Sequence, residues 1–351
     1  DNMNTLWNSA AYQQDLETTA SNIVHLERLK DTSILITGAS GLVGSYIIDT
    51  LLYANETYQL GMTIYGCGRN VSALEQQFPY GGDCLRFIEY DVNRDCSDLD
   101  IASLDYIIHA ASNAHPATIY NDPVGTITAN VQGTKYLLDL AKRFTSCRLL
   151  FISSGEIYGV GNGDPFTEDY AGYIDITSSR SCYPISKRCA ENLCVSYYEQ
   201  YQVDTVIARL CHTFGANNLE RDSRASAQFM KKAIQGEDIV LNSTGGAIRS
   251  YSYISDSVSG ILSVLTAGES ANAYNISNGS EISISELAEE IGRIANVNVT
   301  YNITNSQASP FSYAVLDNSK LKGLGWSPQF TVPYGLEHTF NITSSCKGSD
   351  A

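Results

Sequence analysis

A tyrosine and a lysine stand four residues apart in the segment YPISK, as Tyr183 and Lys187. On a helix, side chains with this spacing lie on the same face. An ammonium group beside a phenol favours the phenolate, so we expect Lys187 to lower the pKa of Tyr183 from about 10 toward the working pH. Such a tyrosine can take a proton from a substrate hydroxyl while hydride leaves the same carbon. The pair predicts a catalytic base, although the same spacing also occurs in exposed pairs on ordinary helices.

Two further polar residues follow the apolar run in FISSGEIYG. Ser154 could donate a hydrogen bond to the oxygen that Tyr183 addresses. Glu156 is a carboxylate that could act as acid or base at a neighbouring carbon. Open α/β sheets bind ligands beyond the carboxyl ends of their strands, where both residues are expected. We therefore place both in the catalytic group, with a helix cap or a surface glutamate as the alternative for Glu156.

A glycine-rich segment, TGASGLVG, follows the apolar run SILI and precedes a predicted helix. Glycines are needed where such a turn is tight, where backbone amides approach a pyrophosphate, and where the helix packs on the strand. The start of the helix offers unpaired N–H groups to the phosphates. The segment predicts a dinucleotide site formed by Gly38, Ser40, Gly41, Leu42, Val43 and Gly44.

The ends of the next predicted strands supply further cofactor contacts. An acidic residue after the second strand would bind the ribose hydroxyls of NAD, but Arg69 stands there and could pair with the 2′-phosphate of NADP. The alternative for Arg69 is a solvated loop residue. His109 is expected to be a packed strand-end histidine, because no second ligand sits at metal spacing, and we predict no metal site. The remaining expected cofactor contacts are Asp91, Val92, Ala110, Ala111 and Ser112, with Tyr183 and Lys187.

These residues need a framework that alternates strands and helices. Short apolar runs separated by helical stretches, from Ser33 to Arg209, predict an α/β fold with a Rossmann-type doubly wound parallel sheet and a smaller C-terminal α/β substrate lobe. Two helices are expected over 124–143 and 183–201. The expected division is an N-terminal helical extension over 1–30, an NAD(P)-binding domain over 31–209 plus 248–276, and a substrate lobe over 210–247 plus 277–345.

The composition excludes several classes of protein. The net charge of −16 argues against nucleic-acid binding, which needs a basic surface. No run approaches the roughly 18 apolar residues of a membrane helix, so we expect a soluble chain with no membrane partner. The nine cysteines are odd in number, scattered and free of CxxC pairs, which is typical of reduced thiols in a cytoplasmic protein.

The motifs TGASGLVG, DV, HAAS, SSGEIYG and YPISK, in this order, resemble those of the extended short-chain dehydrogenase/reductase family, the NAD-dependent epimerases and dehydratases that modify nucleotide sugars. The resemblance extends over about residues 32–340. Four stretches are most similar to UDP-glucuronate decarboxylases and dTDP-glucose 4,6-dehydratases: NDPVGTITANVQGT, RSCYPISKRCAENLC, ARLCHTFG and IVLNSTGGAIRSYSYISD. The resemblance implies a nucleotide-sugar substrate and a tightly bound cofactor. The family favours NAD as this cofactor, whereas Arg69 favours NADP.

The resemblance also implies roles for single residues. Arg249 would hold the nucleotide diphosphate, with His212 and Arg224 as further substrate contacts and Arg209 and Arg221 in the same region. Asn130 would be a structural residue that supports the active site. Members of the family usually form homodimers, in which the helices expected over 124–143 and 183–201 pack into a four-helix bundle.

One departure from the resembling sequences bears on the reaction. Dehydratases carry Asp-Glu where this chain has Gly155-Glu156, and that Asp is their acid for expelling a hydroxyl. Decarboxylases carry Ser-Glu, since loss of CO₂ needs no such acid. The sequence therefore favours a UDP-glucuronate decarboxylase-like enzyme. The alternatives are a 4-epimerase, a 4,6-dehydratase, a 4-keto reductase that consumes NADPH, or a dinucleotide sensor without catalysis.

Overall fold

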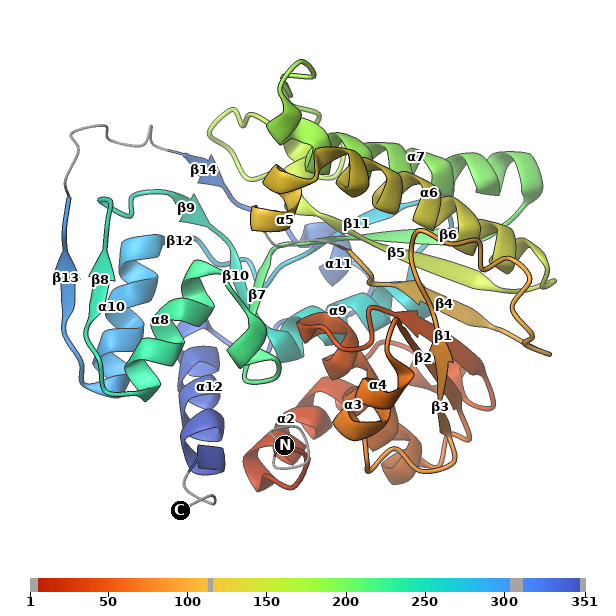
Figure 1. The fold of residues 1–351 in the computed structure, drawn as a ribbon, viewed down its shortest axis with the longest axis horizontal. Helices are drawn as coiled ribbons and strands as arrows, with labels where there is room; N and C mark the ends of the chain where they lie inside the picture. The colour runs from red at the N-terminus through yellow and green to blue at the C-terminus, as the bar shows by residue number, and fades with distance from the viewer. Residues whose placement is uncertain (1–5, 113–115, 304–311, 348–351) are drawn as a thin grey trace.

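The computed structural model describes residues 6–112, 116–303 and 312–347 (Figure 1). Its centre is a sheet of seven parallel strands, which lie in the order β3-β2-β1-β4-β5-β6-β11. This is the doubly wound order, so the predicted Rossmann-type sheet is confirmed. The strands are β1 (Ser33–Thr37), β2 (Thr63–Gly68), β3 (Leu85–Glu89), β4 (Tyr106–His109), β5 (Arg148–Ser154), β6 (Asp204–Leu210) and β11 (Ala273–Ile276).

Helices cover both faces of this sheet (Figure 1). On one face α6 (Pro123–Lys142) and α7 (Cys182–Tyr201) pack together over β4, β5 and β6. On the other face lie α3 (Leu42–Tyr58), α9 (Ile254–Ala267) and, behind them, α2 (Ala10–Ser21). The two helices predicted from the sequence over 124–143 and 183–201 are α6 and α7, displaced by at most one residue.

Burial on both faces explains why the central strands are continuous apolar runs. Ile34 and Ile36 on β1 are fully buried in the hydrophobic cluster that includes α2, α3 and α9. Leu35 between them is fully buried in a separate cluster with residues of α6 and α7. Neighbouring residues of a strand point to opposite faces, so a strand sandwiched between helices carries no polar alternation.

The smaller lobe lies beside the sheet, at the left of Figure 1. Its strands form three small sheets: β7 (His212–Phe214) with β10 (Tyr251–Tyr253), β9 (Ile248–Arg249) between β12 (Ile282–Ser283) and β14 (Tyr313–Ala314), and β8 (Ile239–Leu241) with β13 (Val299–Tyr301). Its helices are α8 (Ala225–Ile234), α10 (Ile284–Ala295) and α12 (Val332–Lys347).

The segment 248–276 contributes to both lobes. Its later part, α9 and β11, lies with the large sheet, whereas β9 pairs with strands of the smaller lobe and β10 with β7. Residues 1–5 of the expected N-terminal extension and 304–311 of the expected substrate lobe lie outside the described residues. The short elements are η1 (Leu26–Leu29), α4 (Val71–Gln77), α5 (Pro116–Asn121), η2 (Gly155–Tyr158), η3 (Ser179–Ser181), η4 (Leu219–Arg221) and α11 (Ser319–Lys322).

Within the described ranges, no helix has the length and apolar character that crossing a membrane requires. All nine cysteines are free thiols.

Candidate active site

The glycine turn joins β1 to α3, and its three glycines meet different surroundings. Gly38 has a φ of +67°, and a Cβ there would lie 2.8 Å from the backbone of Ala110 and Ala111. A Cβ on Gly44 would lie 2.0 Å from the carbonyl oxygen of Gly38. At Gly41 the nearest atom to such a Cβ is 3.6 Å away, so this position is open. Close packing therefore requires glycine at residues 38 and 44, whereas Gly41 leaves open space beside the start of α3.

The ends of β1 and β4 are joined by one hydroxyl. Thr37 Oγ1 accepts hydrogen bonds from the N–H groups of Ala110 and Ala111, both at 3.1 Å, and lies 2.8 Å from Nδ1 of His109. Burial, and then the charge of Lys187, lower the pKa of His109 to about 3. His109 is thus a neutral, packed strand-end residue, as the sequence predicts, and the described residues contain no cluster of His, Cys, Asp or Glu that could hold a metal.

The other expected cofactor residues lie at the ends of β2 and β3. Arg69 follows β2 directly and is exposed. The carboxylate of Asp91 accepts a hydrogen bond of 2.9 Å from the N–H of Asn93, which holds the turn after β3. Val92 packs against α6, since a Cβ on Gly133 would lie 2.3 Å from its Cγ2. These residues lie at the same edge of the sheet as the glycine turn.

Tyr183 and Lys187 lie in the first turns of α7 and are both buried, with 9% and 3% of their surface exposed. The hydroxyl of Tyr183 interacts with the side chains of Ser154 and Ser112, and both contacts favour its ionised form. The ammonium of Lys187 donates a hydrogen bond of 2.9 Å to the carbonyl of Ile152 and lies 5.6 Å from the centre of the Tyr183 ring. The ends of β4 and β5 thus meet the start of α7.

The prediction that Lys187 lowers the pKa of Tyr183 is wrong when only the residues of the chain are considered. Burial, and then the negative charge of Glu156, raise the pKa of Tyr183 to about 12. Burial also lowers the pKa of Lys187 to about 8, against the opposing charges of Glu191 and Glu156. The ammonium lies toward the Ile152 carbonyl, and desolvation is the larger effect on both groups. The protein by itself therefore holds Tyr183 as a neutral phenol.

Glu156 is the second residue of η2, which follows β5, and its N–H donates a hydrogen bond of 3.1 Å to Ser154 Oγ. It is exposed to solvent, yet partial desolvation raises the pKa of its carboxyl, while the charges of Arg249 and then Lys187 act in the opposite direction. Arg249 comes from β9 in the smaller lobe and is held by the carbonyl of Ser312 at 3.2 Å. One arginine of the smaller lobe therefore faces the candidate acid–base group.

His212 and Arg224 lie near this group as well. The ring of His212 stacks on Tyr251, with 5.1 Å between centroids. Desolvation, and then the charges of Arg224 and Arg249, lower the pKa of His212 to about 4, so the ring is neutral near pH 7. The guanidinium of Arg224 binds both oxygens of Asp222 and also acts on the pKa of Tyr183. The three expected substrate residues thus surround one region beside Tyr183.

Arg209 differs from the expectation, whereas the expectation for Arg221 stays a prediction. Arg209 lies behind the site with 12% of its side chain exposed, and its guanidinium pairs with Glu191 at 2.7 Å, so it has a structural partner instead of a diphosphate. Arg221 is exposed on η4. The expected supporting residue Asn130 is buried on α6, and its amide donates a hydrogen bond of 2.9 Å to Ser186, between Tyr183 and Lys187.

Sequence reasoning missed two contacts that shape the site. Asn217, in the loop after β7, donates hydrogen bonds of 2.7 and 2.8 Å to the Leu42 carbonyl and the Ser45 hydroxyl at the start of α3. Ser112 was expected to contact the cofactor only, and it also reaches the hydroxyl of Tyr183. No local pattern could indicate either contact, because the partners come from segments far apart in the chain.

The glycine turn fits the pyrophosphate of a nicotinamide dinucleotide. The N-cap residue of α3 is Gly41, which supplies no side-chain cap, so the N–H groups of the first helical turn lack an intrahelical partner. The open Cβ position at Gly41 lets a phosphate approach these groups. The helix dipole adds a partial positive charge at the same place.

The chain belongs to the NAD dependent epimerase/dehydratase family, whose pattern matches residues 34–277, and the resemblance drawn from the motifs is confirmed. It is similar to UDP-glucuronic acid decarboxylase 1 of Danio rerio, with 33% identity over 314 residues that cover 89% of this chain and 72% of the relative.

Two solved structures share the fold. UDP-glucuronic acid 4-epimerase of Bacillus cereus, in complex with UDP-glucuronic acid and NAD, has a TM-score of 0.76 and 23% identity, and the match covers 89% of this chain and 99% of that one. dTDP-glucose 4,6-dehydratase of Bacillus anthracis, in complex with NAD, has a TM-score of 0.74 and 22% identity, over 90% and 97% of the two chains.

Proposed function

We propose that this protein converts UDP-glucuronate to UDP-xylose by transient oxidation at C4 and loss of CO₂. The proposal is carried by the groups that meet beside Tyr183: Ser154 on its hydroxyl, and Glu156 facing Arg249. At residue 155, where dehydratases have their acid by resemblance, a Cβ would lie 3.2 Å from the side chain of Leu316. Gly155 has no side chain that could serve as that acid, which favours decarboxylation over dehydration. The similarity to UDP-glucuronic acid decarboxylases supports the same substrate.

The residues that would hold the cofactor are those of the glycine turn, Arg69, Asp91, Val92 and the segment 110–112, with Tyr183 and Lys187. Oxidised nicotinamide supplies, when bound, an acceptor for the hydride at C4 and a positive charge that favours the phenolate. That charge acts against the desolvation that raises the pKa of Tyr183 to about 12.

Tyr183 accepts the proton of the sugar 4-hydroxyl as C4 is oxidised. The resulting β-keto acid breaks its C5–carboxyl bond, CO₂ leaves, and the electron pair moves to the C4 oxygen. Ser154 and the protonated Tyr183 stabilise that oxyanion by hydrogen bonds. Glu156, whose pKa is raised by desolvation, returns a proton to C5. Tyr183 gives its proton back to the C4 oxygen when C4 is reduced, so the cofactor is regenerated in each turnover and can stay bound.

The test is incubation of the purified chain with UDP-glucuronate, with and without added NAD, followed by mass spectrometry. UDP-xylose or its 4-keto precursor is expected, and both should form far more slowly with Tyr183→Phe. Conversion of a different nucleotide sugar, with UDP-glucuronate left untouched, would eliminate this substrate. Nucleotides that copurify with the protein identify the base and the cofactor in the same measurement.

Reduction of a 4-keto sugar is the second candidate, because the exposed Arg69 at the end of β2 suits a 2′-phosphate. It predicts consumption of one NADPH for each product. Decarboxylation and epimerisation leave the nicotinamide pool unchanged, so absorbance of the reduced ring separates the candidates.

We also propose that two copies pack through α6 and α7. Large apolar side chains are exposed on both helices, at Val124, Ile127, Tyr198 and Tyr201. Light scattering after size-exclusion chromatography tests this, and a monomer at micromolar concentration would overturn it. A cytoplasmic location is supported by the nine free thiols, which suit a reducing compartment.

A further inference from the structure

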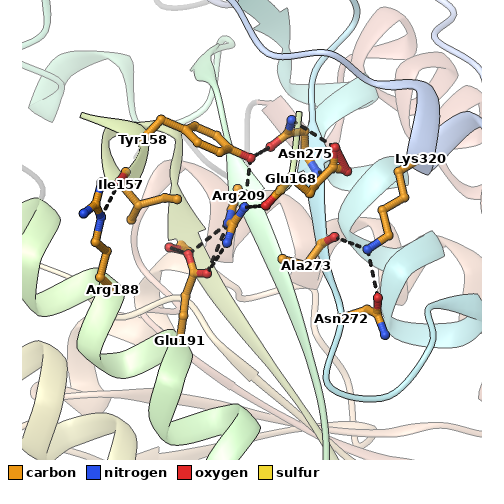
Figure 2. A network of polar contacts seen from close by, with 11 residues as sticks. Ile157, Tyr158, Glu168, Arg188, Glu191, Arg209, Asn272, Ala273, Asn275 and Lys320 are labelled. Carbon is orange, nitrogen blue, oxygen red and sulfur yellow. Dashed lines mark hydrogen bonds and ion pairs between the residues drawn. The ribbon is translucent and has the colours of Figure 1, made fainter. Parts of the chain in front are cut away.

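A buried ion pair lies behind the candidate site (Figure 2). Glu191, one helical turn after Lys187 on α7, is 7% exposed. Its Oε1 accepts hydrogen bonds from Arg209 at 2.7 and 3.1 Å, and its Oε2 accepts a bond of 2.6 Å from the hydroxyl of Ser153. Every one of these partners comes from a different element, namely α7, β6 and β5.

Arg209 extends the connection to the segment that carries Glu156. Its Nη1 donates hydrogen bonds to the hydroxyl of Tyr158 at 2.9 Å and to the carbonyl of Glu168 at 2.8 Å. Tyr158 lies two residues after Glu156 on η2, and its own hydroxyl donates to Asn275 on β11. Figure 2 shows the guanidinium of Arg209 between Glu191 and Tyr158. Arg209 thus links α7 to η2, and Tyr158 continues the connection to β11.

The pair reaches both candidate catalytic segments. Through Glu191 it lies next to Lys187, whose protonation that carboxylate favours. Through Ser153 it holds the last residues of β5, and the neighbouring Ser154 contacts the hydroxyl of Tyr183. A buried ion pair is often no better for stability than apolar residues of the same size, so its place here favours a role other than stability.

We propose that Glu191, held by Arg209, is a positioning residue that keeps Lys187 charged and fixes the end of β5 against Tyr183. The inference rests on the proposed function, since it assigns Glu191 to the same site. Glu191 touches neither substrate nor reacting atoms and acts through Lys187 and Ser153.

The charged and titratable groups around Lys187 come from three elements. They are Glu191 and Tyr183 on α7, Glu156 on η2, and His109 on β4. Burial keeps His109 neutral above a pKa of about 3, so it adds no charge near pH 7. The two carboxylates are therefore the charges that favour the ammonium, and Glu191 is the larger of the two influences.

The first test measures Lys187 directly in the full chain. The pKa is read by NMR from lysine labelled with ¹³C at Cε, with the Lys187 signal assigned by Lys187→Met. Glu191→Gln is expected to lower that pKa by about one unit, because a neighbouring opposite charge is lost. Glu191→Asp keeps the charge and is expected to restore most of the shift. This readout needs no substrate.

The second test is the pH dependence of turnover. With the pKa of Lys187 moving from about 8 to roughly 7 in Glu191→Gln, the rate should fall about fivefold at pH 8 and change little at pH 6. A loss of the same size at every pH, with the Lys187 signal unmoved, would overturn the proposal. Asp204→Asn is the matched control, because it breaks an ion pair of 2.9 Å between Arg148 on β5 and Asp204 on β6, at the other end of the two strands that carry Ser153 and Arg209.

Glu191→Gln leaves Arg209 buried without its counter-charge, so the single variant can fail to fold. The double variant Glu191→Gln with Arg209→Gln leaves no unpaired charge and should show the same fall in the pKa of Lys187, since Arg209 is not among the groups that shift it. If UDP-glucuronate is not converted but the NMR shift occurs, the proposed function fails and the role of Glu191 stands. If conversion occurs and the double variant moves neither the pKa nor the pH profile, the role of Glu191 fails alone.

Discussion

The hydroxyl of Tyr12 on α2 donates a hydrogen bond to the carboxylate of Asp49 on α3, and both side chains are buried. Tyr80 donates a second bond, of 2.8 Å, to the same carboxylate. Also on α2, the buried Asp15 accepts from Tyr253 on β10 and lies 2.8 Å from the His338 ring on α12. Helix α2, which precedes the region matched by the family, is therefore part of the core between the two lobes.

This network predicts a pH-dependent stability. Burial raises the pKa of Asp49 to about 7, so the folded chain holds a proton that the unfolded chain releases above about pH 4. Its contribution to the free energy of unfolding should fall as the pH rises from about 4 to about 7, by on the order of 4 kcal/mol. Asp49→Asn removes this slope, so the variant gains stability relative to the wild type between pH 5 and pH 8.

Urea unfolding at several pH values measures this, with the exposed Asp83→Asn as control. Parallel stability curves for Asp49→Asn and the wild type would contradict the assignment.

Two glycines of the turn should separate folding from cofactor binding. Gly44→Ala forces a Cβ to 2.0 Å from the Gly38 carbonyl and should cost about 2 kcal/mol or more of stability. Gly41→Ala has room in the fold, so the melting temperature should change little while the Kd for NAD rises about tenfold. Calorimetry gives both quantities. Equal losses of stability in the two variants would argue against separate roles.

Tyr183→Phe should reduce kcat by about 10²–10⁴-fold while the cofactor still binds, since only the proton-transferring hydroxyl is lost. The control is Tyr58→Phe, an exposed tyrosine at the end of α3 and outside the proposed dimer helices, which should keep full activity. Product formation from UDP-glucuronate is the measurement. Unchanged turnover in Tyr183→Phe would remove the proposed base.

Glu156→Gln should slow the step after oxidation. The amide cannot return a proton to C5, so kcat should fall about 100-fold with KM little changed, and reduced nicotinamide should accumulate. Ultraviolet absorbance follows the reduced ring. Glu199→Gln, an exposed glutamate on α7, serves as the control. A fall in binding alone would instead assign Glu156 to substrate contact.

Arg69→Ala tests the choice of cofactor. Arg69 is exposed, so the folding stability should not change. If its guanidinium binds the 2′-phosphate, the Kd for NADP should rise about tenfold and the Kd for NAD should stay the same. Titration of the two cofactors decides this, and equal effects on both would leave Arg69 without a selective role.

The sheet and the glycine turn could be predicted because their signals are local. Strands such as SILIT are apolar throughout, and the spacing of Tyr183 and Lys187 identifies one helix face. The sequence could not indicate the pKa of Tyr183, because desolvation depends on which segments enclose the phenol. The sequence could not indicate the ion-pair partners of Arg209 and Arg224 either. One pairs with a glutamate on α7 and the other with Asp222, and only tertiary packing determines that difference.

The contact between Gly38 and the end of β4 limits how this protein can be re-engineered. The space that a side chain at residue 38 would need is filled by the backbone of residues 110 and 111, and Thr37 holds those same amides. The two loops are therefore transferable between relatives only as a matched pair, whereas residue 69 can be exchanged separately. A chimera that imports only one of the two loops would misplace the other loop. Cofactor preference is best altered by substitution at residue 69, which follows β2.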